Sequence, residues 1–195
     1  TFIKKRWGSL LLVVFLAGGF GATYQVSIIF MKQYLPLLMP HTSSIMTTFS
    51  VLLVLVFGLV MPLSGFLADR FNLMLIIKCS LVLTLVACGL FLVSIQQNLV
   101  NLTLLSCVLL AAATAPFNAL AHGVIVKAFR ANERYRGVSL GHTTGSLLMS
   151  GPANFVCIYC MNNFNWTLFP IMYIAFFAVV VFVTVVIFVK REKRS

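Results

Sequence analysis

Residues 50–95 read SVLLVLVFGLVMPLSGFLADRFNLMLIIKCSLVLTLVACGLFLVSI, two long apolar runs on either side of a short polar turn. Each run has the roughly 20 residues that a helix rising 1.5 Å per residue needs to cross the hydrocarbon core of a bilayer. The turn, Asp69-Arg70-Phe71-Asn72, supplies polar groups where the chain reverses. The stretch therefore predicts two antiparallel transmembrane helices.

The rest of the chain repeats this pattern. Of its 195 residues, 61% are hydrophobic and 9% are charged, and the mean hydropathy is +1.06. Soluble domains carry about 25% charged residues, so a water-soluble fold could not cover this much apolar surface. Continuous apolar runs also favour helices over the alternating strands of a barrel. We expect an all-α polytopic membrane protein, one domain over residues 1–195, with six transmembrane helices at about 8–31, 45–67, 73–95, 102–126, 138–161 and 166–189.

The basic residues predict the orientation of the chain. If the six spans cross the membrane in alternating directions, only Lys32 lies on one side of the membrane, and the other thirteen Lys and Arg residues lie on the opposite side. Basic loops are retained in the cytoplasm, so both termini are predicted to be cytoplasmic. The thirteen are Lys4, Lys5, Arg6, Arg70, Lys78, Lys127, Arg130, Arg134, Arg136, Lys190, Arg191, Lys193 and Arg194.

Several function classes are disfavoured. The net charge of +11 does not predict a nucleic-acid partner, because the basic residues form short blocks beside lipid headgroups. No span carries HExxH or paired aspartates, so neither enzyme activity nor a metal or cofactor is predicted. The three acids, Asp69, Glu133 and Glu192, lie outside the spans, so this chain offers no intramembrane carboxylate to couple transport to an ion.

The polar residues within spans gather in the first, fourth and fifth. Unsatisfied polar groups are costly in hydrocarbon, so these three helices should face a cavity or each other. Hydrogen bonding between helices would explain the residues as well as contact with a substrate would. The best candidates for the substrate pathway are Tyr24, Gln25, Asn118 and His142; the others are His122, Thr143, Thr144 and Asn154.

Glycine and proline mark three of the spans. Gly18-Gly19-Phe20-Gly21 in the first span and Ala115-Pro116 in the fourth occupy equivalent places if spans 1–3 and 4–6 are inverted repeats. Interrupted helices in such positions indicate a binding site near the middle of the membrane. In the fifth span, Gly137, Gly141 and Gly145 form a repeated GxxxG stripe, which predicts close packing against a neighbouring helix.

The loop after the second span carries the most specific local pattern, Gly65-Phe-Leu-Ala-Asp69-Arg70. We expect Gly65 to permit a tight helix exit, Asp69 to accept from the start of a nearby helix and Arg70 to anchor at the headgroups. The pattern resembles the signature loop of the major facilitator superfamily, G-x-x-x-D-R/K-x-G-R/K. It departs at Asn72 and Leu73, where the family has a second glycine and a base.

Three further stretches resemble the metabolite:proton symporter branch of that superfamily, which includes proline/betaine and dicarboxylate permeases. These are residues 24–35, residues 130–145 and the pair Gly151-Pro152. The resemblance covers essentially the whole chain, as helices 7–12 of a twelve-helix transporter of the bacterial inner membrane. It implies a fold of two inverted three-helix repeats and symport of protons with a small polar solute by alternating access.

The implied partners are the bilayer, the solute, protons and a missing N-terminal six-helix half, which in that branch holds the coupling carboxylate. The chain also begins at Thr1 and not at Met, which suggests a fragment. A six-span membrane subunit or scaffold that transports nothing is the alternative.

Overall fold

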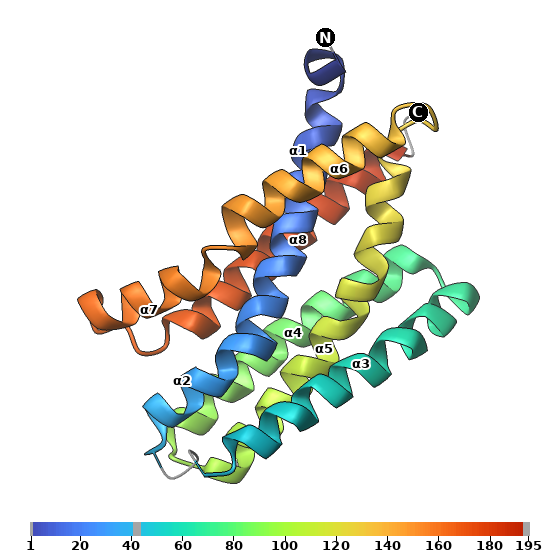
Figure 1. Ribbon diagram of the computed structural model, residues 1–195. Helices are drawn as coiled ribbons and strands as arrows, with labels where there is room; N and C mark the ends of the chain where they lie inside the picture. The colour runs from blue at the N-terminus through green and yellow to red at the C-terminus, as the bar shows by residue number, and fades with distance from the viewer. Residues whose placement is uncertain (1, 41–43, 193–195) are drawn as a thin grey trace.

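The computed structural model describes residues 2–40 and 44–192, with the side chains of residues 7–40 and 44–189. Over these residues the chain is all-α and makes six passes (Figure 1). Five of the six passes contain helices long and apolar enough to span a membrane; the pass over the predicted fifth span does not. The elements are α1 (Phe2–Tyr24), the π-helix η1 (Gln25–Phe30), α2 (Met31–Leu38), α3 (Met46–Arg70), α4 (Leu73–Gln96), α5 (Val100–Lys127), α6 (Arg134–Gly145), the π-helix η3 (Ser146–Ser150), α7 (Ala153–Phe164) and α8 (Phe169–Glu192).

Successive passes run up and down through the bundle. Figure 1 shows the two ends of the chain and the connection from α5 to α6 at the top, with the turn from α3 to α4 at the right. The connections from α2 to α3, α4 to α5 and α7 to α8 lie at the bottom and left of the same view. The blocks of basic residues thus lie away from the end that holds Lys32.

The helices pack in two groups of three passes. In one group α5 packs on α3 and α4. In the other, α1 packs on α6, η3 and α8. Contacts of α4 with α8 and of α1 with α5 join the two groups. Each of α1 and α5 is therefore surrounded by other helices, and much of both is buried.

The first span extends further than predicted. Helical backbone continues without a break through α1, η1 and α2 to Leu38, beyond the expected end near residue 31 and through Pro36, which lies between the first two expected spans. Proline inside a membrane helix is tolerated where neighbouring groups and a local π adjustment accommodate it, and η1 directly precedes α2.

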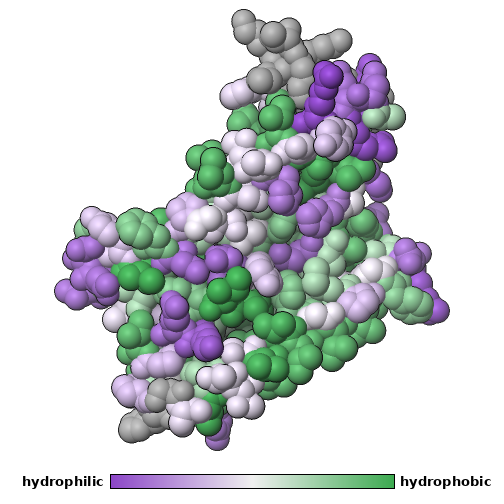
Figure 2. All heavy atoms as spheres, viewed as in Figure 1, coloured by the Kyte–Doolittle hydropathy of each residue, from purple (hydrophilic) through white to green (hydrophobic). Residues whose placement is uncertain are grey.

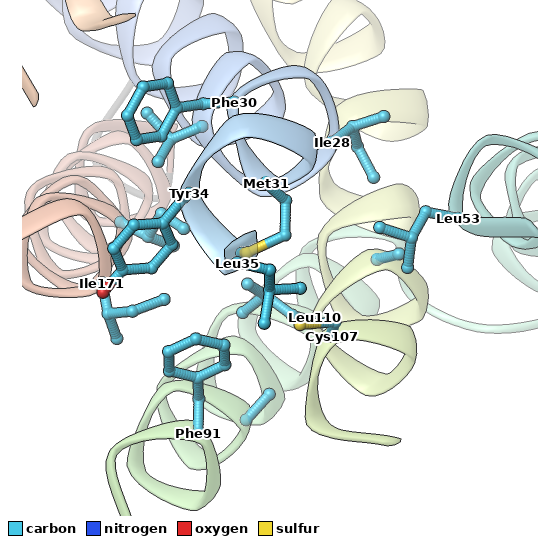
Figure 3. Close-up of a cluster of buried hydrophobic side chains, with 14 of the residues drawn as sticks. Ile28, Phe30, Met31, Tyr34, Leu35, Leu53, Phe91, Cys107, Leu110 and Ile171 are labelled. Carbon is cyan, nitrogen blue, oxygen red and sulfur yellow. The ribbon is translucent and has the colours of Figure 1, made fainter. Parts of the chain in front are cut away.

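Packing explains why this last part stays helical. Tyr34 is fully buried, and its ring stacks between those of Phe30 and Phe91, with centroid distances of 6.0 and 5.9 Å. Figure 3 shows these rings beside Ile171 of α8, with Cys107 of α5 close by. Lipid tails are as apolar as these side chains, so the close packing of the rings, and not their removal from water, favours the helical path through Pro36.

The fourth span is continuous despite its proline, because a side chain from α4 forms hydrogen bonds with backbone groups of α5 beside that proline. The hydroxyl of Ser80 donates to the carbonyl of Ala113 (2.6 Å) and accepts from the N–H of Phe117 (3.2 Å). It is thus inserted between a donor and an acceptor that an undisturbed helix would join directly. The expected interruption at Ala115-Pro116 is therefore absent from the helical run of α5.

The fifth span is not the single helix that we predicted. Residues 134–164 form two helices, α6 and α7, which are separated by η3 and a turn at Gly151-Pro152 (Figure 1). Proline lacks an N–H and clashes with the preceding turn of a helix, and glycine adds backbone freedom. The hydroxyl of Tyr173 in α8 donates to the carbonyl of Met149 at 3.0 Å, which gives the irregular segment a partner.

The outer surface of α3 is almost entirely apolar. Figure 2 shows this edge of the molecule in green. Exposed Leu52, Leu59, Leu63, Phe66 and Leu67 make it up. Such a surface suits lipid tails, because nothing on it needs a hydrogen bond.

Candidate functional site

Three helices bring a pair of histidines and two phenylalanines together. The rings of His122 in α5 and His142 in α6 stack with centroids 5.7 Å apart. Phe20 of α1 contacts both, at 4.9 and 5.7 Å, and Phe117 lies 6.4 Å from Phe20. The polar residues of the first, fourth and fifth spans were predicted to face a cavity or each other, and the two histidines do face each other.

Both members of this histidine pair lie away from the ends of their helices. His122 is about 7 Å before the last residue of α5, and His142 is about 12 Å beyond the first residue of α6, at 1.5 Å per residue. His122 is nevertheless exposed, and His142 is half-buried. An exposed imidazole inside a membrane needs water or another polar protein surface to cover it.

The same side of the first span carries a second polar feature. Tyr24 follows Phe20 by one turn, so the two lie next to each other on the helix surface. The ring of Tyr24 lies 5.1 Å from that of Phe57 in α3. Tyr24, Ile28 and Lys32, spaced by four residues, then line one wall of a groove between the first span and α3.

The groove has a volume of about 360 Å³. Its opposite wall consists of Ser50, Val51, Val54 and Leu55 of α3. Lys32, about 9 Å before the end of α2, is exposed within it. Volumes of roughly 300–1,000 Å³ are typical of small-molecule sites, so the groove is at the small end of that range.

The four predicted pathway residues do not form one cluster. Tyr24 lines the groove, and His142 belongs to the histidine pair. Gln25 is half-buried at the first position of η1. Asn118 is buried, and its side-chain amide donates to the carbonyl of Thr114 in its own helix at 2.9 Å. Asn118 therefore already has a partner within α5.

Two of the three stripe glycines of α6 lie against α1. A Cβ atom at Gly145 would meet the carbonyl of Val14 and lie 2.8 Å from the backbone nitrogen of Gly18. A Cβ atom at Gly141 would lie 2.5 Å from the side chain of Val13. Gly137 instead lies beneath the ring of Phe129 in the loop before α6. The two helices thus approach each other through glycine on both sides.

In the signature loop, the helix-capping residue differs from our expectation. Gly65 is within α3, which continues to Arg70, and so Gly65 does not end a helix. The side chain of Asn72, and not that of Asp69, accepts from the N–H of Met74 at 2.9 Å and caps α4. The guanidinium of Arg70 lies 4.6 Å from the ring centre of Phe66.

Sequence reasoning missed the importance of Lys32 and Phe20. The signal for Lys32 was present, because it is the one base opposite the other thirteen and it lies inside a candidate span. Phe20 gave no signal, because its contact with two histidines arises only from the packing of α1 against α5 and α6. Within residues 2–40 and 44–192, His, Cys, Asp and Glu form no group of three that could hold a metal ion.

Comparisons with family models, curated proteins and solved structures give no match for this chain.

Proposed function

We propose that the chain is the C-terminal six-helix half of a secondary transporter of the major facilitator superfamily, and that it carries a small polar solute together with protons by alternating access. One observation carries the proposal. Tyr24, Lys32, His122 and His142 all lie on helices of the bundle and are at least partly exposed, and Phe20, which contacts both histidines, lies one turn before Tyr24 of the groove. Lipid cannot satisfy such a surface, whereas a hydrated pathway against a second half can.

The packing of the helices supports two inverted three-helix repeats. The contacts of α1 with α6 and α8 correspond to those of α5 with α3 and α4 when the first three passes are exchanged for the last three. A unit of three spans must reverse its direction in the membrane when it is repeated, so such repeats are inverted. In this arrangement α1 and α5 are equivalent central helices.

The distribution of charge supports the placement of both termini in the cytoplasm of a bacterial cell. Thirteen basic residues share one side, where positive charge is retained during insertion. Protons would be exchanged with carboxylates of the N-terminal half.

The test is uptake into proteoliposomes under an imposed proton gradient. The full-length protein, containing this chain and its N-terminal half, should accumulate a labelled solute such as proline, glycine betaine or succinate. This chain alone should accumulate none, because alternating access needs two halves. Proton-driven accumulation by the chain alone would contradict the proposal. A full-length protein that has only these six spans would favour the non-transporting subunit.

A further inference from the structure

Lys32 differs from every other basic residue in its surroundings. It lies within a candidate membrane span, about 9 Å before the end of α2, whereas the other bases that the structure describes lie toward the opposite end of the bundle. The acids Asp69 and Glu133 are likewise at that opposite end. Among the residues that the structure describes, Lys32 has no acidic partner.

The position of Lys32 at the edge of the groove gives its charge a definite target. The ammonium group is a compact charge with three donors and no acceptor, so it needs acceptor oxygens. Tyr24, two turns earlier on the same wall, and Ser50 across the groove bring hydroxyl groups to a lining that is otherwise aliphatic. Few polar groups in an apolar groove of about 360 Å³ are the usual composition of a small-molecule site.

We infer that Lys32 binds an anionic oxygen group, a carboxylate or phosphate, of the transported solute. This inference rests on the proposed function, since it assigns a chemical class to the solute in that pathway. A lysine near the end of a span can also reach a lipid headgroup, whose phosphate offers the same chemistry. The groove on the polar side of the first span favours the solute, and the experiment separates the two sources.

Binding is measured by thermal unfolding of the full-length protein in maltoside detergent, which contains no phosphate. The probes are acetate, succinate, glycine betaine and inorganic phosphate, compared with succinamide and with sodium chloride at equal ionic strength. A ligand that binds only the folded protein raises its Tm. We expect at least one anion to stabilise the wild type, Lys32→Gln to weaken its apparent affinity at least about tenfold, and Lys32→Arg to retain most of it.

Two controls fix the source of the anion. Lys78→Gln removes a base near the start of α4, at the other end of the bundle, and should leave the affinity unchanged. Phosphatidylglycerol added to the micelles should not reproduce the Lys32-dependent stabilisation. The inference is overturned if no anion stabilises the wild type, if Lys32→Gln binds like the wild type, or if only the lipid gives a Lys32-dependent effect.

The proposed function can fail or stand separately, because binding is measured without transport. If the protein takes up an uncharged solute and Lys32→Gln does not change that uptake, the proposed transporter function stands and the anion site is refuted. If the protein binds an anion through Lys32 but accumulates no solute, the anion site stands and the proposed transporter function is refuted.

Discussion

At the scale of single residues, the hydroxyl of Ser80 is the clearest structural determinant, because it completes the backbone hydrogen bonding of another helix beside Pro116. Ser80→Ala would leave the N–H of Phe117 and the carbonyl of Ala113 without that partner in a buried position. An unsatisfied buried polar group costs about 1–3 kcal/mol. We expect the free energy of unfolding in mixed micelles to fall by about that amount.

The matched control is Thr84→Ala, one turn away on the same helix. Thr84 is equally buried, but its hydroxyl donates only to the carbonyl of Ser80 in its own helix, at 2.9 Å. Its loss should therefore destabilise the protein less. Equal losses in the free energy of unfolding for the two substitutions would show that the hydrogen bonds from Ser80 of α4 to α5 have no special role.

The histidine pair supplies a second prediction at this scale. If His122 and His142 face a hydrated pathway, His122→Ala and His142→Ala should each lower uptake by the full-length protein about tenfold, which corresponds to about 1.4 kcal/mol. Val86→Ala, on the exposed apolar face of α4, should leave uptake within about twofold. Normal transport by both histidine variants would show that the histidine pair is not part of the solute pathway.

At the scale of elements, the contact between α1 and α6 depends on glycine. Gly145→Ala would place a methyl group against the backbone of α1 near Gly18, where no rotation of a side chain can relieve the clash. Overpacking of this kind costs about 1–3 kcal/mol, and we expect a loss of that size in the free energy of unfolding.

Gly89→Ala in α4 is the matched control for this interface. A Cβ atom at Gly89 would meet nothing within 4 Å. Alanine is also the better helix former by roughly 1 kcal/mol, so this variant should be as stable as the wild type or slightly more so. A neutral Gly145→Ala would mean that α1 and α6 do not approach as closely as described.

The elements also show how far the sequence could be read. Hydropathy located the second, third, fourth and sixth spans to within a few residues, because long apolar helices bounded by polar turns need little tertiary information. It failed at Pro36, where burial of Tyr34 keeps the chain helical, and at Pro152, where the fifth pass divides. Two prolines had opposite outcomes because packing, which the local sequence does not contain, decided each.

Prediction of the site was limited in the same way. Residue type and depth identified Tyr24 and His142 as candidates, and the structure places one in the groove and the other beside His122. The same reasoning selected Asn118, whose amide is already bonded within α5. Whether an intramembrane polar side chain faces a pathway or its own backbone depends on rotation and neighbours, and hydropathy reports neither.

At the scale of the whole molecule, the zigzag of six passes can be tested by labelling single cysteines in intact cells. In a variant lacking Cys79, Cys88, Cys107, Cys157 and Cys160, Asn98→Cys should react with an impermeant thiol reagent, because it lies in the turn between α4 and α5. Asn132→Cys, before α6, should react only after the membrane is opened. The reverse pattern would invert the orientation.

We propose that one side of this bundle, marked by the histidine pair and the groove, faces water or another half of the protein and not lipid. The most direct measurement needs no knowledge of the solute: reaction of His122→Cys and Leu63→Cys with a water-soluble thiol reagent, in the cysteine-free full-length protein in membranes. Both positions are exposed in the bundle, and Leu63 is on the apolar face of α3. We expect rapid labelling at position 122 and little at position 63; labelling at 63 with none at 122 would contradict this proposal.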